Sequence, residues 1–315
     1  MFSLVKNELI KIFSKKVNWA YIIIIIGAVI AAGLIQREFA VEEDENWREG
    51  LEAEISQLEA DLAVAPDEEK EWLQSEIDKN RDYLENDINP NARSTWHFLN
   101  STVLGVGMLV TLFSVIVGSA TVASEFADGT IKQLLIRPHP RWAILLSKYL
   151  SAILYAILLI GVLILSGYLV GLLFFGAGDF NAKFYELNLS FDETEAVIGT
   201  QFILKILYYL PSLLITITIA FMISTLFKSQ AMAVGFGIFI VFISSTLGGF
   251  IIMLAEQYSW VKFLIFPHMD LTVFALQDTI LQDVTLTTSL LILGAYYIVF
   301  MVITFWFFQK RDISI

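Results

Sequence analysis

Six long apolar runs constrain this chain more than any other feature of its sequence. Crossing the roughly 30 Å hydrocarbon core of a bilayer takes about 20 helical residues, and every run reaches about that length. Their charged residues are Lys148 and Lys205, near run ends where a long stem reaches the interface. The runs are Val17–Gln36, Ser101–Val122, Ala143–Phe175, Ile203–Phe227, Gln230–Leu254 and Thr287–Phe308. We therefore expect an all-α membrane protein with six transmembrane helices.

The distribution of charge predicts how these spans are oriented. With both termini in the cytoplasm, the cytoplasmic segments hold 11 of the 20 Lys and Arg residues but only four of the 32 Asp and Glu residues. An excess of basic residues on the cytoplasmic side is the usual bias of multi-pass proteins. Trp19, Trp96, Trp142, Trp260 and Trp306 fall near span ends, as interfacial aromatics do. We predict a protein of a bacterial plasma membrane, with both termini cytoplasmic.

Residues 37–100 form the one sizeable water-soluble part, between residues 1–36 and the five spans of residues 101–315. Apolar residues recur in it every three or four positions on both sides of Ala65-Pro66-Asp67, which predicts two antiparallel helices in an extracellular hairpin. The hairpin holds 19 acidic and six basic residues. Such a surface is more often solvated than a binding site, and capture of a cationic peptide is the sharper alternative.

Two shorter apolar patterns lie beside the spans. In residues 2–13, Phe2, Val5 and Ile12 share one helical face, which favours a helix lying in the cytoplasmic interface. The alternative is a simple inward extension of the first span. On the outer side, residues 260–266 form an apolar patch too short to cross, which predicts one re-entrant or interfacial helix ending at Pro267.

Several kinds of chemistry are missing. The chain has no cysteine and no Gly-Lys dipeptide, which excludes thiol chemistry and a phosphate-binding loop. His97, His139 and His268 are scattered over both faces, so we expect no metal site and assign each to the interface. The spans contain no carboxylate or arginine to couple transport to an ion. We expect no catalytic residue, no bound cofactor and no nucleic-acid partner, so any active transport must draw energy from another polypeptide.

The most informative segment follows the second span. In it Glu125 leaves the membrane, and Gly129 permits a tight bend. Residues 130–136 have the pattern of a short amphipathic helix, and Pro138 and Pro140 end it before the third span.

This segment resembles the hallmark of type-2 ABC-transporter permeases, roughly E-x-x-x-G-T-[ILF]-x-x-L-L-x-x-P-x-x-R-x-x-[IL]-x-x-x-K. The matching positions are Glu125, Gly129, Thr130, Ile131, Leu134, Leu135, Pro138, Arg141, Ile144 and Lys148. Residues 4–16 look like the family's elbow helix, and residues 227–230 look like its tight loop between spans four and five. The hairpin of residues 37–100 is larger than in a minimal member, which leaves the substrate open.

The resemblance implies the membrane half of an ATP-driven exporter for a hydrophobic or peptide-like substrate. Two permease subunits, identical or related, would each dock a separate ABC ATPase that binds ATP and Mg. The coupling helix, at about residues 124–137, would sit in a groove of the ATPase. Its implied coupling residues are Glu125, Phe126, Gly129, Thr130, Ile131, Leu134, Leu135 and Arg141. The alternative function is a membrane-anchored sensor or immunity component that binds a ligand through the hairpin.

Small residues four apart indicate close helix packing. The pairs are Gly167 with Gly171, Ser244 with Gly248, and Ser245 with Gly249. We favour packing within one bundle over packing between subunits. The family's dimer seam involves spans one and five, which makes Ser244, Ser245, Gly248 and Gly249 the candidates for subunit packing.

Overall fold

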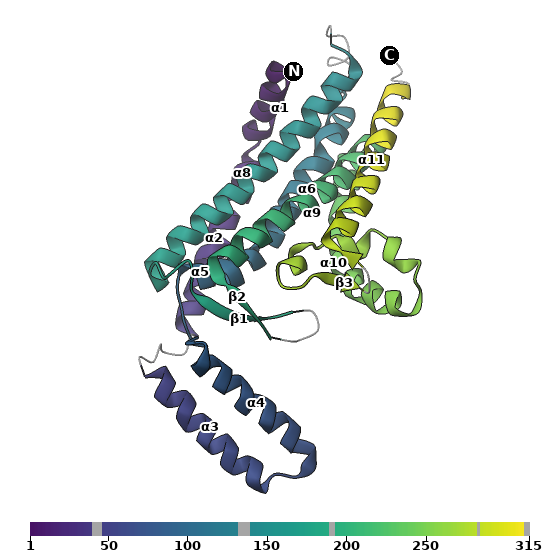
Figure 1. The fold of residues 1–315 in the computed structure, drawn as a ribbon. Coiled ribbons are helices and arrows are strands. Elements are labelled where there is room, and N and C mark those ends of the chain that lie inside the picture. The colour runs from purple at the N-terminus through teal and green to yellow at the C-terminus, as the bar shows by residue number, and fades with distance from the viewer. Residues whose placement is uncertain (40–45, 132–138, 189–192, 282–283, 312–315) are drawn as a thin grey trace.

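The computed structural model describes residues 1–39, 46–131, 139–188, 193–281 and 284–311, without the side chains of residues 244, 245, 248, 249, 252 and 256. The described chain is mostly helical and forms a bundle with both termini at one end, the terminal end (Figure 1). A helical hairpin projects from the opposite end. The bundle helices are α1 (Phe2–Ser14), α2 (Lys16–Glu38), α5 (Thr95–Phe98), the π-turn η1 (Leu99–Val103), α6 (Leu104–Ala127), α8 (Arg141–Phe175), α9 (Ile198–Leu226), α10 (Gln230–Gln257) and α11 (Leu286–Lys310).

Within the described residues, five helical stretches are long and apolar enough to cross a membrane. They are Lys16–Glu38, Thr95–Ala127, Arg141–Phe175, Ile198–Leu226 and Leu286–Lys310. Their large apolar side chains are often exposed, as at Leu173 and Leu291, and lipid is the solvent that such a surface requires. The protein is therefore a multi-pass membrane protein. The apolar stretch described in α10, Gln230–Ile243, is shorter, so the sixth span stays a prediction.

Helix α6 lies at the centre of the bundle and packs against α8, α9 and α10. Polar side chains inside the bundle find partners on neighbouring helices. The Tyr149 hydroxyl of α8 lies 2.7 Å from the Thr218 hydroxyl of α9, and the Thr111 hydroxyl of α6 lies 2.6 Å from that of Tyr209. Such pairs satisfy groups for which lipid offers no hydrogen bond.

Gly167 and Gly171 let α8 approach the chain that leads into α6. A Cβ atom at Gly167 would lie 2.7 Å from Val103 Cγ2, and one at Gly171 would lie 3.1 Å from Thr95 Cα. Neither contact leaves room for a side chain. These glycines serve packing within the bundle, whereas the structure does not describe what Ser244, Ser245, Gly248 and Gly249 of α10 contact.

The projecting hairpin consists of α3 (Trp47–Val64) and α4 (Asp67–Glu85), which run side by side (Figure 1). Its buried apolar residues are Leu51 and Ile55 on α3 and Leu73 and Ile77 on α4. Each helix buries a narrow stripe only, so most of its charged side chains face water. The hairpin is thus a pair of solvent-exposed helices that projects from the bundle (Figure 1).

A β-hairpin, β1 (Lys183–Leu187) and β2 (Glu193–Val197), joins this helical hairpin to the bundle. Because neighbouring side chains of a strand point to opposite faces, Tyr185 and Glu186 have different partners. The Tyr185 hydroxyl donates to Asp82 Oδ2 of α4 at 2.6 Å, and Glu186 accepts from Lys205 Nζ of α9 at 2.5 Å. The expectation of an all-α fold is wrong in this segment, since the pairing of two short strands satisfies the backbone groups of the loop between α8 and α9.

The segment between α10 and α11 also differs from the expected single helix. Its described residues, which leave out 282–283, form three short 3₁₀ turns, η2 (Val261–Phe263), η3 (Phe266–His268) and η4 (Thr272–Ala275), and a second β-hairpin, β3 (Thr279–Leu281) with β4 (Val284–Thr285). Pro267 lacks an N–H and interrupts any longer helix. His268 is completely buried, which corrects its assignment to the interface.

His268 is held as a neutral ring. Its Nε2 lies 2.8 Å from the Lys262 carbonyl oxygen, which only accepts, so Nε2 carries the proton and Nδ1 accepts from the Ser289 hydroxyl at 2.9 Å. Burial lowers the pKa of His268 below its usual 6.5. As the pH falls through 6.5, the unfolded state therefore binds a proton at His268 while the folded state does not. This uptake favours unfolding, so the stability that the neutral ring contributes is lost as the pH falls below 6.5.

We predict that His268→Gln flattens the pH dependence of stability between pH 7.5 and 5.5. In the unmodified protein, the free energy of unfolding should fall with pH below 6.5 by up to about 1.4 kcal/mol per pH unit, which is the limit for the uptake of one proton. Unfolding in detergent at a series of pH values measures it. Equal slopes for the two proteins would show that His268 titrates alike in the folded and unfolded states.

Candidate functional site

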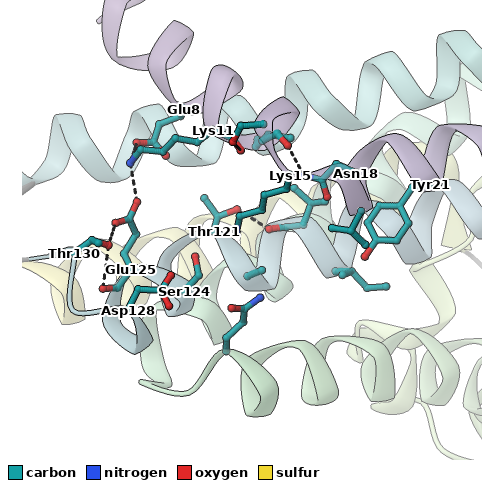
Figure 2. A pocket seen from close by; sticks show the side chains of 17 residues that line it. Glu8, Lys11, Lys15, Asn18, Tyr21, Thr121, Ser124, Glu125, Asp128 and Thr130 are labelled. Atoms are coloured by element: carbon teal, nitrogen blue, oxygen red, sulfur yellow. Dashed lines mark hydrogen bonds and ion pairs between the residues drawn. The ribbon is translucent and has the colours of Figure 1, made fainter.

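The segment singled out by sequence begins where α6 ends. Asp128 keeps helical backbone angles, and Gly129 then adopts a φ of +71°. No atom outside its own helix lies near a Cβ built at Gly129, so the backbone angle and not space requires glycine there. The Thr130 hydroxyl hydrogen-bonds back to the Glu125 carboxylate across this turn (Figure 2). The turn is therefore closed locally, and the tight bend predicted at Gly129 is confirmed.

A network of four charged side chains, the Glu8–Lys11–Glu125–Lys148 network, surrounds the end of α6. Lys148 Nζ lies 2.7 Å from Glu8 Oε2 and 3.0 Å from Glu125 Oε1. Lys11 Nζ lies 2.7 Å from the same Glu125 oxygen and 3.1 Å from Glu8 Oε1. The network thus ties α1, α6 and α8 together by two cations and two anions.

Burial distinguishes this network from surface ion pairs. The Lys148 side chain is 0% exposed and both carboxylates are 9% exposed, while Lys11 remains about half exposed. Desolvation lowers the pKa of Lys11, but its hydrogen bond to Glu125 and the charge of Glu8 outweigh burial and raise the pKa overall. Lys11 therefore stays charged, and the four charges balance.

The network corrects one inference from sequence. Lys148 does not extend its stem to the interface, because its ammonium group lies fully buried between two carboxylates. Glu125 lies beyond the predicted span Ser101–Val122 and is a buried carboxylate near the end of the helical stretch Thr95–Ala127. Sequence reasoning noted Glu8 and Lys11 only as part of a helix. The available signal was that Glu8 lies between Val5, Leu9 and Ile12 on a largely apolar face.

Two further residues of the segment contact the end of α11. The Arg311 guanidinium lies 4.1 Å from the Phe126 ring centroid. Arg141 Nη1 donates to the backbone oxygens of Gln309 at 3.1 Å and Arg311 at 3.3 Å. The start of α8 and the end of α6 are therefore both fastened to the last helix.

The described part of the expected coupling helix is divided between buried and exposed residues. Glu125 is buried and Ile131 is 3% exposed, whereas Ala127, Asp128 and Gly129 are exposed. Leu134 and Leu135 lie outside the described residues. The exposed apex of this turn is consequently Ala127–Gly129.

Beside the network lies a half-open cavity of about 410 Å³, the α1–α6 pocket (Figure 2). The α1–α2 turn forms one side, α6 forms another, and Gln230 at the start of α10 also lines it. Figure 2 shows Lys11 and Glu125 meeting at the end of this pocket. No group of three His, Cys, Asp or Glu residues in the described chain is arranged to hold a metal ion.

Comparison with known proteins places this chain in a family. Residues 73–314 match the family described as Protein of unknown function (DUF2705). The chain is similar to Uncharacterized protein YhcI of Bacillus subtilis (strain 168), with 31% identity over 319 residues and full coverage of both chains. It is also similar to Uncharacterized membrane protein YdbK of that organism, with 29% identity over 211 residues, or 67% of this chain and 80% of the relative. The chain therefore belongs to the DUF2705 family, and it is a multi-pass membrane protein with bacterial relatives.

Proposed function

We propose that this chain is the transmembrane permease subunit of an ATP-driven ABC transporter and exports a hydrophobic or peptide-like substrate. A separate ATPase subunit, which binds ATP and Mg, docks on the segment that follows α6. A second permease, identical or related, completes the pathway. The chain itself carries out no ATP hydrolysis.

The observation that carries this proposal is the bracing of the α6 end by the Glu8–Lys11–Glu125–Lys148 network. A segment that receives force from a docked protein transmits it only if it does not bend independently of the bundle. Buried ion pairs hold Glu125 to α1 and α8, while Phe126 and Arg141 contact the end of α11. A push on the turn would therefore move several helices as one rigid body, which is a known route to alternating access.

This geometry divides the predicted coupling residues into two roles. Glu125 and Ile131 are buried, so they position the turn and would not touch the ATPase. The exposed apex Ala127–Gly129 is the described surface on which an ATPase docks. The resemblance of the sequence to type-2 permeases extends that surface to Leu134 and Leu135.

The proposal includes a topology. Both termini lie at the terminal end of the bundle, which requires an even number of crossings (Figure 1). With α10 as the sixth crossing, the basic residues around α1 and the segment after α6 face the cytoplasm, as the positive-inside bias requires. The acidic α3–α4 hairpin is then extracellular.

The test is co-purification with an ABC ATPase produced together with this chain, followed by measurement of ATP hydrolysis in the complex. We expect the permease to stimulate hydrolysis and Gly129→Val to reduce that stimulation about tenfold, equivalent to about 1.4 kcal/mol of coupling. A side chain at a φ of +71° costs about 1–2 kcal/mol in backbone strain and would reshape the turn.

Gly105→Val is the matched control, because Gly105 lies in α6 without a positive φ and with no atom near its Cβ position. It should leave stimulation intact. Failure of the two proteins to associate, or undiminished stimulation in Gly129→Val, would contradict the proposal.

A further inference from the structure

The α1–α6 pocket lies at the terminal end of the bundle, beside the start of α2 and the end of α6. It adjoins the turn between α1 and the first crossing helix, α2. Trp19 sits one turn into α2, is half exposed and donates to the Phe13 carbonyl at 2.9 Å. Trp142 and Trp306, also exposed, mark the same end of the bundle on α8 and α11. Exposed tryptophans at a common level are typical of the interface.

The lining of the pocket is amphipathic. Charged and hydroxyl side chains lie toward the terminal end, where Glu125, Asp128 and Thr130 follow one another at the end of α6. Val17 and Val117 line it from α2 and α6 on the membrane side. A volume of about 410 Å³ is within the range of small-molecule sites. A pocket with these two halves at an interface fits a ligand that has a polar head and an apolar tail.

The charges of the lining define that head. Glu8 and Glu125 are neutralised by Lys11 and Lys148. Of the charged residues that line the pocket, Lys15 and Asp128 have no ion-pair partner in the described part of the chain, and both are exposed. They reach the pocket from opposite elements, the α1–α2 turn and the end of α6 (Figure 2). The pocket therefore offers one cation and one anion to a ligand.

The start of α2 strengthens the positive side. No side chain caps its first turn. The Asn18 N–H donates to the Lys15 carbonyl oxygen at 3.0 Å, which leaves the N–H groups of Lys16 and Val17 uncapped, and Val17 lines the pocket. Uncapped N–H groups at the start of a long helix favour an anion, above all a phosphate. Together with the Lys15 ammonium group, they form a site for the negative part of a head group.

We propose that the α1–α6 pocket binds the head group of a zwitterionic phospholipid with a primary amine. The phosphate contacts Lys15 and the first turn of α2, the ammonium group donates to Asp128, and the first part of an acyl chain lies along Val17 and Val117. A phosphate head without an amine leaves Asp128 unpaired. A quaternary amine lacks the N–H donors that the Asp128 carboxylate accepts. Asp128 also belongs to the exposed apex on which the proposed ATPase docks, so lipid binding is tested with the chain alone, where docking plays no part.

The experiment uses the full chain in nanodiscs that contain equal amounts of phosphatidylethanolamine, phosphatidylcholine and phosphatidylglycerol. The protein is released from the nanodiscs in a mass spectrometer, and the lipids that stay bound to it are counted. We expect at least about tenfold preference for the ethanolamine lipid, or about 1.4 kcal/mol. Lys15→Gln should abolish retention, and Asp128→Asn should make the ethanolamine and choline lipids equal. Lys16→Gln is the matched control, because Lys16 is exposed but does not line the pocket.

A free phosphate is the other source of the same anionic group. Addition of inorganic phosphate should not displace the lipid, since the apolar lining contributes to binding. Displacement by phosphate would overturn the proposal, as would equal retention of the three lipids by the unmodified chain. The proposal would also be overturned if Lys15→Gln and Lys16→Gln reduced retention of the ethanolamine lipid equally. Because Lys15 and Asp128 are exposed, we expect the Lys15→Gln and Asp128→Asn variants to have the same unfolding temperature as the unmodified chain. Thermal unfolding of the three proteins checks that the substitutions leave folding unchanged.

Discussion

Lys148→Met should lower the free energy of unfolding by about 3–5 kcal/mol, the range for breaking a buried ion pair from one side. The substitution preserves the apolar stem but leaves Glu8 and Glu125 buried, with only the half-exposed Lys11 to neutralise them. Unfolding in mixed micelles, followed by circular dichroism, measures the loss. The end of α6 should also become more accessible to hydrogen exchange, because its main brace is gone.

The double variant Lys148→Met with Glu8→Gln separates charge balance from packing. It leaves one cation and one anion, Lys11 and Glu125, which are 2.7 Å apart. It should therefore be more stable than Lys148→Met alone, with a coupling energy of about 0.5–3 kcal/mol. Lys70→Met is the surface control, since its pair with Asp67 is exposed and worth at most about 1 kcal/mol. Equal losses at Lys148 and Lys70 would show that burial adds nothing to the network.

Gly167→Leu should destabilise the bundle by about 1–3 kcal/mol or prevent it from assembling, as overpacking of a close helix contact does. Its Cβ alone would lie 2.7 and 2.9 Å from the two methyl carbons of Val103 and 3.0 Å from Leu99 Cδ2. The backbone of α8 must move away, and the contact with the chain that leads into α6 opens. Thermal unfolding in detergent and recovery from the membrane measure the effect.

Gly161→Leu is the matched control, because it places the same side chain on the same helix where no atom lies within 4 Å. It should change the unfolding temperature little. A smaller effect at Gly167 than at Gly161 would mean that α8 does not pack closely against Val103. Val103→Ala in the Gly167→Leu background should restore part of the loss, since it removes the two methyl groups in the way.

Particular residues show how far local sequence carried the prediction. Five of the six predicted spans could be read from the sequence, because about 20 consecutive apolar residues have one common solution in lipid. The Gly129 turn was equally readable, since few residues other than glycine accept its φ of +71°. The β1–β2 hairpin was not, because its pairs run from Lys183 with Val197 to Leu187 with Glu193 and short polar strands give little periodic signal.

The candidate site illustrates the other limit. Glu8 and Lys148 are 140 positions apart, and Lys11 and Glu125 are 114 apart, so no local pattern says that they meet. Taken alone, Lys148 reads as a lysine that reaches the interface, which is the usual position for a charge near a span end. Its burial required two carboxylates from other helices, because a lone ammonium group in that environment would be strongly disfavoured.

The sequence by itself determined five spans, the bend after the second span and the absence of a GxxxxGK[ST] motif, because each depends on neighbouring residues or on simple length. The tertiary structure decided which charges pair, which glycines lie in close contacts, and where Lys15 and Asp128 face a common pocket. The physical reason is that the energy of a buried charge or a helix contact is set by what lies opposite it. That partner is chosen by the packing of the whole bundle.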